Sequence, residues 1–483
     1  MINSKLYFFV ILLFVYSAAF PQYDWNNGGG NPERNGLSPA PGPTTDSLLW
    51  QDNAAGLFGM PCYIEDNMLV TMRFMTMTNS PVTCYDIHTG VMMWQKDVTG
   101  FTGRSVPVGV RNGKVYVMGF RETLHDSLYA LDINTGEKVW TANSTYTPWI
   151  SSSVSFADNG DLLVEKMGFI SRINHANGEA VWNCPAYPFV IGHLEMAVNH
   201  DNNTGYILES IGMIPYITAI DLTTGTKKYN HILNETNPGG GLQQAPIMVG
   251  NNGVIYAHKQ GDNITALLDN GASLEVLWET PITGNAPFSH TCIGADGSVY
   301  APDYDKIIRI DPSDGAIRNT SGSVVSNPEL FQLRLSASQN NLVFATNGEN
   351  RLYAFDLELN VLWSTTIPNV NTSGAAIGAN GLIAVTGTNT VRVYAAASTV
   401  DIAETKAVND LEIFPNPCID RINIEAGMAF HDKPFILYDE AGRTVRSGLL
   451  DPGVTLLDLE TLKPGTYFLV SGSKKERIIK GAH

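Results

Sequence analysis

The chain has 483 residues, a formal net charge of −17 at pH 7, and 16% charged against 44% hydrophobic residues. This composition excludes an intrinsically disordered chain, and the acidic balance excludes a protein that binds nucleic acid or an anionic membrane surface through its net charge. The five cysteines include no CxxC pair, which excludes zinc ribbons, thioredoxin-like redox motifs and c-type haem attachment. The apolar strand contexts of Cys62, Cys84, Cys184 and Cys292 predict that these four fill the core.

Residues 1–21 form a predicted signal peptide. Lys5 precedes an apolar run from Leu6 to Tyr16, and the small residues from Ser17 to Ala19 provide a cleavage site. The run is too short to span a bilayer with margin, so an uncleaved anchoring helix is only the alternative. No other apolar run approaches spanning length. The chain is therefore expected to be exported, and the mature chain to lack a transmembrane span.

A strand–turn–strand cassette recurs along residues 22–397, and its clearest copy is Leu128–Trp140. Period-2 alternation over Leu128–Ile133 predicts a strand, Asn134–Gly136 a tight turn, and Lys138–Trp140 the return strand. The closing positions lie 41 to 49 residues apart and are Trp50, Trp94, Trp140, Trp182, Tyr229, Trp278, Asn319 and Trp363. Strand repeats with a period of about 40 to 50 residues are typical of propellers, whose units must stack to bury their faces.

Eight closing positions predict an all-β fold with an eight-bladed β-propeller. Seven blades is the alternative, because the units around Trp278 and Asn319 are degenerate. The last unit stops after Val391–Tyr394 without a return strand, whereas residues 47–50 form a return strand without a unit. We therefore expect strand 47–50 to complete the last blade, so that the ring closes and no sheet edge stays exposed there.

The pattern A-x-D-x-x-T-G-x-x-x-W at Ala130–Trp140 resembles the repeat of the pyrroloquinoline-quinone-type (PQQ-like) β-propellers, and the resemblance spans residues 31–397. It implies that each tryptophan docks one blade on its neighbour. These blade-docking residues are Trp50, Trp94, Trp140, Trp182, Trp278 and Trp363. The adjacent cysteine pair and the calcium-ligand motifs of the quinone enzymes in that family have no counterpart here. No cofactor, metal or catalytic residue is therefore expected.

The C-terminal region lacks the sequence pattern of the repeats. Residues 398–410 are polar and lack a strand pattern, which predicts a linker, and residues 411–483 contain seven short strands, which predict a small antiparallel β-sandwich. This tail resembles the C-terminal sorting domain of type IX secretion cargo in Bacteroidetes. The motif positions are Pro415, Asn416, Pro417, Gly442, Gly465 and Tyr467. The resemblance implies delivery by the type IX secretion machinery to the medium or the outer cell surface; an ordinary accessory sandwich is the alternative.

No catalytic motif is readable, since Walker A, HExxH, GxSxG and GxGxxG patterns are all missing. Asp201–Gly205 and Asp303–Asp305 carry oxygen donors but lack a complete calcium-loop pattern, so we expect both to be blade turns. A disulfide between Cys62 and Cys84 remains open at this point.

The leading prediction is an exported, non-catalytic propeller that binds an unidentified protein or glycan at the mouth of its central channel. Long connectors such as Ala142–Ile150 and Asn234–Gln244 are the expected contact surfaces. One alternative is a quinone-dependent or other propeller enzyme. Another is an outer-membrane assembly scaffold, which the sorting tail disfavours because cargo sent outside the cell does not act in the periplasm.

Overall fold

The computed structural model of the chain is built from β-strands. It describes residues 25–53, 61–73, 80–98, 103–121, 127–145, 153–166, 168–186, 196–211, 214–233, 246–259, 263–284, 289–328, 332–368, 374–378, 381–387, 389–395, 411–414, 416, 418, 420–426, 430, 433–450, 453–472 and 474–481. Contacts divide the chain into two units, Met1–Ala397 and Ser398–His483. The predicted signal peptide and linker lie outside the described residues. Within the described part, no helix is long and apolar enough to cross a membrane.

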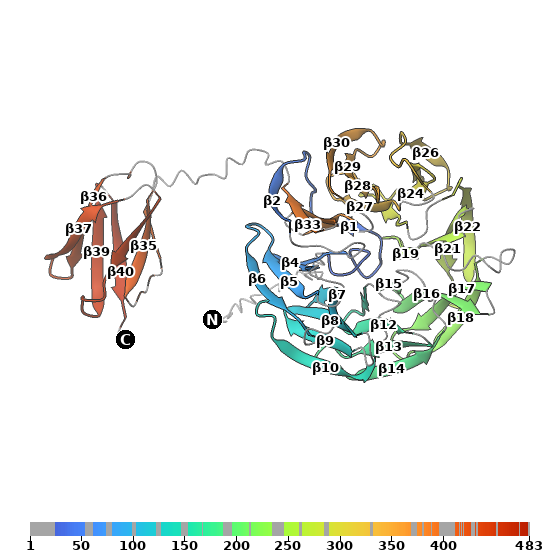
Figure 1. Ribbon diagram of the computed structural model, residues 1–483, viewed down its shortest axis with the longest axis horizontal. Helices are drawn as coiled ribbons and strands as arrows, with labels where there is room; N and C mark the ends of the chain where they lie inside the picture. Colours follow the sequence, from blue (N-terminus) through green and yellow to red (C-terminus); the bar gives the residue numbers. More distant parts are fainter. Residues whose placement is uncertain are drawn as a thin grey trace, which may run out of the picture. The chain divides into compact units, whose positions relative to one another are not determined.

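The described residues of the first unit form eight sheets arranged as a ring (Figure 1). Four sheets consist of β3 (Tyr63–Glu65), β4 (Met68–Met72), β5 (Val82–Asp86) and β6 (Met92–Lys96); β7 (Gly103–Arg111), β8 (Lys114–Arg121), β9 (Ser127–Asp132) and β10 (Lys138–Thr145); β11 (Ser155–Phe156), β12 (Leu162–Lys166), β13 (Phe169–Ile173) and β14 (Ala180–Pro185); and β15 (Ala197–Asn199), β16 (Thr204–Ile211), β17 (Ile214–Asp221) and β18 (Lys227–Ile232).

The other four sheets continue around the ring. They consist of β19 (Met248–Val249), β20 (Ile255–Lys259), β21 (Asn263–Asp269) and β22 (Leu274–Pro281); β23 (Cys292–Ile293), β24 (Val299–Asp303), β25 (Lys306–Ile310) and β26 (Ile317–Thr320); β1 (Leu37–Ser38), β27 (Arg334–Ser338), β28 (Leu342–Thr346), β29 (Arg351–Phe355) and β30 (Val361–Thr366); and β31 (Ala376–Ile377), β32 (Ile383–Gly387), β33 (Thr390–Tyr394) and β2 (Leu48–Asp52). The closing positions all lie in strands at the outer edges of these sheets. The predicted all-β propeller fold is confirmed.

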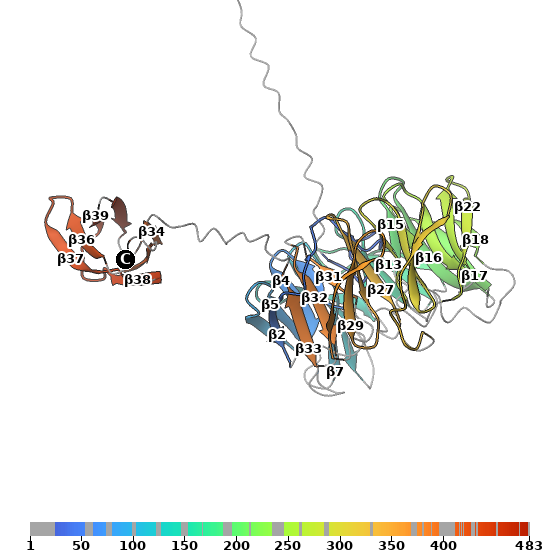
Figure 2. The ribbon, with the colours of Figure 1, turned by 90° about the horizontal axis from the view of Figure 1, so that it is seen from above.

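The last sheet is completed by a strand from the other end of the unit. β2 pairs antiparallel with β33, with Trp50 opposite Val393 and Asp52 opposite Val391, and the two strands lie side by side in Figure 2. These are the two segments that the sequence predicts to pair, although β2 begins one residue later and ends two residues later than the predicted strand 47–50. Because β2 comes from the N-terminal side, this pairing joins the two ends of the ring by hydrogen bonds.

The turn is held by an aspartate in most cassettes and by Asn174 in the cassette that leads to Trp182. Asp132 Oδ1 accepts hydrogen bonds from the backbone N–H of Asn134 at 3.0 Å and of Thr135 at 2.9 Å, and from the Thr135 hydroxyl at 3.1 Å. Gly136, at φ +68°, donates from its N–H to the Asp132 carbonyl oxygen at 2.8 Å. Asp86 and Asp221 make the same contacts with their own Thr-Gly pairs. The repeated D-x-x-T-G pattern thus encodes a turn whose backbone donors are satisfied locally.

Asp221→Asn is expected to lower the free energy of unfolding at neutral pH. The difference between the variant and the wild type is expected to become smaller at acidic pH. Hydrogen bonds from the backbone N–H of Thr224, and then from its hydroxyl and from the Thr223 N–H, hold the pKa of the Asp221 carboxyl below its ordinary value despite partial burial. A carboxylate whose folded pKa is lowered contributes stability above about pH 4, and that contribution is lost as the pH falls through the folded pKa. Urea unfolding midpoints near pH 7 and near pH 3 check this. Asp201→Asn is the control, because Asp201 is an exposed turn aspartate of the same sheet. If Asp221→Asn differs from the wild type by the same amount at both pH values, the expectation is wrong.

The core lies between facing sheets, and the cysteines belong to it. All five cysteine side chains are buried and carry free thiols, including Cys62 and Cys84, so the open question of a disulfide between them is answered in the negative. Burial raises the pKa of each of these two thiols to about 12. The prediction that the cysteines are core filler is confirmed.

The second unit consists of two antiparallel sheets. They are formed by β34 (Leu411–Phe414), β35 (Arg421–Ala426) and β38 (Gly453–Asp458), and by β37 (Thr444–Leu449), β36 (Pro434–Asp439), β39 (Gly465–Ser471) and β40 (Lys474–Lys480). Buried side chains from both sheets, among them Ile422, Ile424, Leu437 and Leu469, share one core cluster. The predicted small antiparallel sandwich is confirmed.

Candidate functional site

The six predicted blade-docking tryptophans each dock on the segment that follows in the ring. Trp94 is 8% exposed, and its Nε1 donates to the Ile133 carbonyl oxygen of the next sheet at 2.7 Å. Its ring lies so close to Gly136 that an added Cβ there would be 2.7 Å from the indole. The corresponding donors and acceptors are Trp50 and Ile87 (2.6 Å), Trp140 and His175 (3.0 Å), Trp182 and Leu222 (3.0 Å), Trp278 and Pro312 (2.9 Å), and Trp363 and Pro43 (3.2 Å).

This geometry gives each cassette residue a physical role. The aspartate, or Asn174 in the turn that receives Trp140, fixes the turn. The residue after it accepts a hydrogen bond from the preceding tryptophan through its carbonyl oxygen, and the glycine leaves room for the indole. Trp363 is the exception, because its acceptor is Pro43, which does not belong to a cassette turn. The next sheet in the ring takes its outer strand, β2, from the N-terminal side, and Pro43 lies just before β2.

Two sheets lack a closing tryptophan and use other contacts that the sequence did not reveal. In the sheet whose closing position is Tyr229, the Tyr206 hydroxyl of β16 donates to Asp269 Oδ2 of the next sheet at 2.5 Å. In the sheet whose closing position is Asn319, Arg309 Nη1 of β25 donates to Glu358 Oε1 of the next sheet at 2.6 Å. Side chains at different positions of the repeat thus join neighbouring sheets at these two places.

The sorting-motif residues are distributed over the sandwich. Asn416 makes two hydrogen bonds to the backbone of the last strand, β40. Its Nδ2 donates to the Arg477 carbonyl oxygen at 2.6 Å, and its Oδ1 accepts from the Ile479 N–H at 2.9 Å. Gly442, at φ +76°, closes the β36–β37 turn, and Gly465 begins β39. The buried Tyr467 donates from its hydroxyl to the Lys463 carbonyl oxygen at 2.6 Å. Pro415 and Pro417 lie outside the described residues. The contacts of the motif residues that are described lie within the sandwich.

The segment 25–43, here called the lead, crosses the axis of the ring (Figure 1). Its carbonyl oxygens accept backbone hydrogen bonds from the innermost segments of six of the eight sheets. The pairs are Trp25 with Ile64 (2.9 Å), Asn26 with Val110 (3.0 Å), Pro32 with Val198 (2.9 Å), Glu33 with Val249 (2.8 Å), Asn35 with Ile293 (2.8 Å) and Gly36 with Ala337 (2.8 Å). β1 then pairs parallel with β27. The lead therefore binds the inner edges of six sheets. It occupies part of the central channel, whose mouth the sequence analysis predicts as the ligand site.

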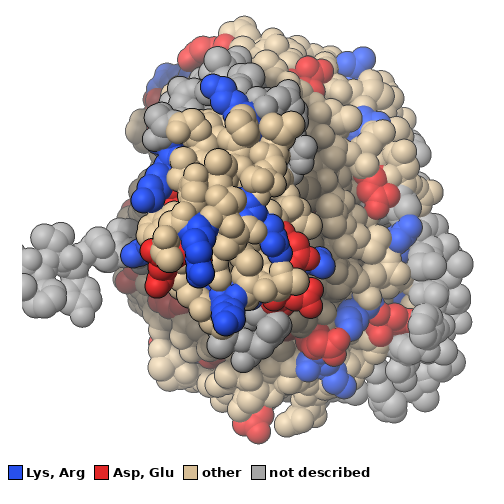
Figure 3. Space-filling view, turned by 90° about the vertical axis from the view of Figure 1, so that its left-hand side faces the viewer, with Lys and Arg blue, Asp and Glu red and all other residues tan. Residues whose placement is uncertain are grey.

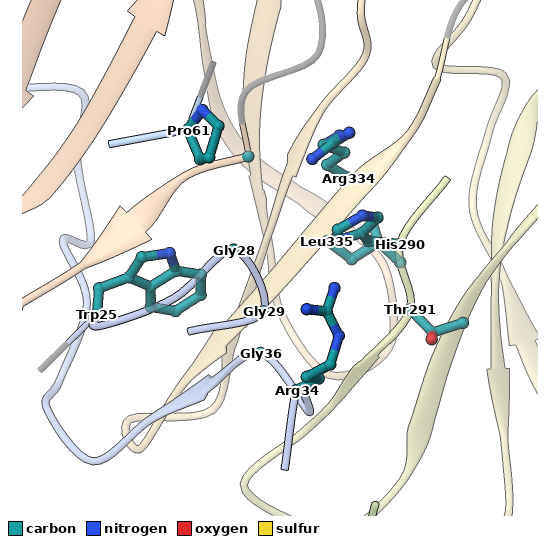
Figure 4. Close-up of a pocket in the computed structure, with 11 residues that line it drawn as sticks. Trp25, Gly28, Gly29, Arg34, Gly36, Pro61, His290, Thr291, Arg334 and Leu335 are labelled. Carbon is teal, nitrogen blue, oxygen red and sulfur yellow. The ribbon is translucent and has the colours of Figure 1, made fainter. Parts of the chain in front are cut away.

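A small pocket lies between the lead and the inner strands. Its described lining consists of Trp25, Gly28, Gly29, Arg34, Gly36, Pro61, His290, Thr291, Arg334, Leu335 and Gly374 (Figure 4). Arg34 is 4% exposed, Arg334 3% and His290 8%. Sequence reasoning missed this pocket, because its residues come from five separate parts of the chain and share no local motif.

The two stretches with oxygen donors that the sequence offered are turns. Asp201–Gly205 connects β15 to β16 and Asp303–Asp305 connects β24 to β25, so both are hairpin turns as expected. Residues 146–150 and 234–244 of the predicted contact connectors lie outside the described part. Among the residues that are described, no group of three or more His, Cys, Asp or Glu side chains is placed to hold a metal ion. On the face shown in Figure 3, acidic and basic side chains are scattered among uncharged ones.

Comparisons with known proteins agree with this architecture. The family model described as outer membrane protein assembly factor BamB matches residues 40–188 and 78–321, and the model described as secretion system C-terminal sorting domain matches residues 412–481. A domain of the second kind marks a protein for secretion or cell-surface attachment. No curated protein matches the chain.

Similar solved structures show the same fold at low identity. Quinohemoprotein alcohol dehydrogenase from Comamonas testosteroni has a TM-score of 0.59 at 15% identity, covering 82% of this chain and 83% of its own. BamB from Moraxella catarrhalis has a TM-score of 0.55 at 13% identity, covering 72% of this chain and 99% of its own. At these identities the likeness concerns the fold alone.

Proposed function

Because the chain belongs to the family described as outer membrane protein assembly factor BamB and also carries a secretion-system sorting domain, we propose that it is an exported, non-catalytic binding propeller, delivered by the type IX secretion machinery to the medium or the outer cell surface. The sorting domain is the single observation that carries this proposal. The ring supplies a rigid scaffold in which tryptophans fix six of the sheets on the next one, and its faces present loops and the lead to a partner.

Three groups with strongly shifted pKa values lie in the packed core of the ring. Burial raises the pKa of Cys62 and Cys84 to about 12 and lowers that of His258 to about 4. These three side chains are enclosed among the strands of the sheets, where a substrate has no access. Reactive groups are instead expected to gather in a cleft. The shifts are those of packed core residues.

Deletion of residues 411–483 in a bacterium that carries this secretion system is expected to abolish delivery outside the outer membrane. The full chain should appear in the medium or on the surface, and the truncated chain should remain in the periplasm. Fractionation followed by immunoblotting measures this, and mass spectrometry of the exported form reads its termini. Residues 398–483 appended to an unrelated periplasmic protein are the reciprocal control, because they should carry that protein outward. Equal delivery with and without the domain would refute the proposal.

An assembly factor acting at the outer membrane is a second candidate, which the family match at residues 40–321 favours. Recovery of the mature protein from washed periplasm, and not from the medium or the cell surface, would support it. The enzyme alternative is tested separately. Incubation with pyrroloquinoline quinone and calcium is expected to leave no quinone absorbance on the protein after gel filtration, whereas stoichiometric bound quinone would contradict a non-catalytic role.

A further inference from the structure

We propose that the secretion machinery binds the sorting domain on the outer face of the sheet β37–β36–β39–β40, through an acidic protein surface that pairs with Lys475 and Arg477. This inference rests on the proposed function, because it names the surface of the sorting domain that the machinery recognises and the chemistry of the partner. The residues involved are not those of the sorting motif.

The sorting-motif residues that the structure describes make their contacts within the sandwich, so they shape the domain. Both polar atoms of the Asn416 side chain bond to the backbone of β40, at Arg477 and Ile479. The hydroxyl of the buried Tyr467 donates to the Lys463 carbonyl oxygen. Asn416 thereby holds in place the strand that carries Arg477. A partner has to be recognised by side chains that point away from the sandwich.

Strand alternation identifies those side chains. Leu437 and Leu469 belong to the core of the sandwich, so the residues next to them in β36 and β39 point outward. The strand register aligns the outward residues of β36, β39 and β40 across the sheet. The outward residues, here called the cationic face, are Ile436, Tyr438, Phe468, Val470, Lys475 and Arg477.

The cationic face combines an apolar centre with two cations. The four apolar or aromatic side chains are half-buried, whereas Lys475 and Arg477 are exposed on β40. In the register, Lys475 lies opposite Val470 and Arg477 opposite Phe468. Lys475 Nζ also lies 4.5 Å from the centroid of the Phe468 ring. The two cations therefore border one side of an apolar surface.

The positive charge of this face is not offset by carboxylates of the same strands. Neither Lys475 nor Arg477 forms an ion pair with a residue that the structure describes. Glu476 alternates to the other side of β40, and Asp439, at the end of β36, pairs with Arg443 at 2.8 Å. The charge is therefore available to a partner.

The outer face of the other sheet differs in this respect. Arg421 of β35 lies with its Nε 3.8 Å from Asp458 Oδ2 of β38, and both side chains are exposed. Leu456, which is 59% exposed, lies opposite Asn423 and not opposite an aromatic residue. Of the two outer faces, only the cationic face joins aromatic side chains with cations that lack an ion pair among the described residues.

These features match an acidic protein surface. The buried centres of protein interfaces are enriched in aromatic residues and arginine, and complementary charges around them fix which partner binds and in which orientation. The chain has a net charge of −17, so an acidic partner is repelled by the molecule as a whole. Such a partner is attracted where cations are exposed, which directs it to the cationic face.

The test is delivery of the full chain in a bacterium that carries the secretion system. Lys475→Glu combined with Arg477→Glu is expected to lower the exported fraction by about tenfold or more, because like charges brought together across an interface oppose binding. Arg421→Glu combined with Lys463→Glu is the matched control. It changes the net charge equally at two exposed positions of the sandwich outside the cationic face, and is expected to leave delivery unchanged. Quantitative immunoblotting of periplasm, surface and medium measures the fractions.

Folding is checked by circular dichroism and thermal melting of the purified full chain. If the charge-reversed variant does not fold, Lys475→Gln combined with Arg477→Gln decides the question, since it removes the charges without adding repulsion and should also lower delivery. Val470→Thr keeps a β-branched side chain of similar shape, and its delivery is expected to fall because the apolar centre becomes more polar.

Three results would overturn the inference. Normal delivery of the folded Lys475 and Arg477 variants, beside blocked delivery of the chain without residues 411–483, refutes the cationic face alone. Export of that truncated chain refutes the proposed function together with this inference. The third result concerns an anionic lipid as the partner. If the full chain cosediments with phosphatidylglycerol vesicles and the charge-reversed variant does not, the face binds a membrane surface and the acidic protein partner is wrong.

Discussion

Trp94→Ala is expected to destabilise the ring by about 3–5 kcal/mol, the range for truncation of a buried tryptophan. The indole is 8% exposed, lies against Gly136 of the next sheet and donates to the Ile133 carbonyl oxygen at 2.7 Å. Truncation therefore opens a cavity between two sheets and removes the hydrogen bond that joins them. Guanidinium unfolding measures the total effect. Since a ring of sheets can open at one interface before the rest unfolds, hydrogen exchange of the β6 and β9 amides locates it.

Two variants separate the contributions at this interface. Trp94→Phe keeps an aromatic ring between the sheets but has no N–H to donate, and is expected to cost less than alanine, with about 1–2 kcal/mol from the lost hydrogen bond. Met93→Ala is the matched control, because Met93 is the preceding residue and is 48% exposed, so its truncation should change stability by no more than about 0.5 kcal/mol. If Trp94→Ala costs no more than Met93→Ala, this tryptophan does not hold the two sheets together.

Gly225→Ala is expected to cost about 1–3 kcal/mol more than Gly113→Ala, the usual range for overpacking. The two glycines have nearly the same backbone conformation, with φ +72° and +69°, so alanine pays the same left-handed penalty of about 1–2 kcal/mol at each. Their surroundings differ. An added Cβ at Gly225 would lie 2.5 Å from the Trp182 ring, whereas at Gly113 nothing lies within 4 Å. The difference between the two variants therefore measures displacement of the indole.

A double-mutant cycle tests this explanation. In a Trp182→Ala background the indole is gone, so the excess cost of Gly225→Ala over Gly113→Ala should disappear. Urea unfolding midpoints for the single and double variants give the coupling free energy. An excess that persists without the indole would assign the cost to another contact of the turn.

The repeat, the closing strand and the sorting domain were predictable from the sequence because each rests on local order. An aspartate, a threonine and a glycine within five residues satisfy one turn, alternation defines the strands on either side, and the tryptophan follows at a fixed distance. The missing return strand after Tyr394 and the surplus strand before Gln51 are also visible as a gap and an excess in the same pattern. The sorting motif likewise carries its turns and its strand order in consecutive residues.

Tertiary structure alone decided what lies at the axis of the ring. The lead has no periodicity, and its carbonyl oxygens accept hydrogen bonds from strands distributed through six sheets, so no local pattern records these bonds. For the same reason Arg34 and Arg334, three hundred positions apart, read as isolated basic residues until closure of the ring places both at one pocket. Short-range turn and strand preferences act between neighbours in the chain, whereas the contents of the channel depend on the order in which the completed sheets meet.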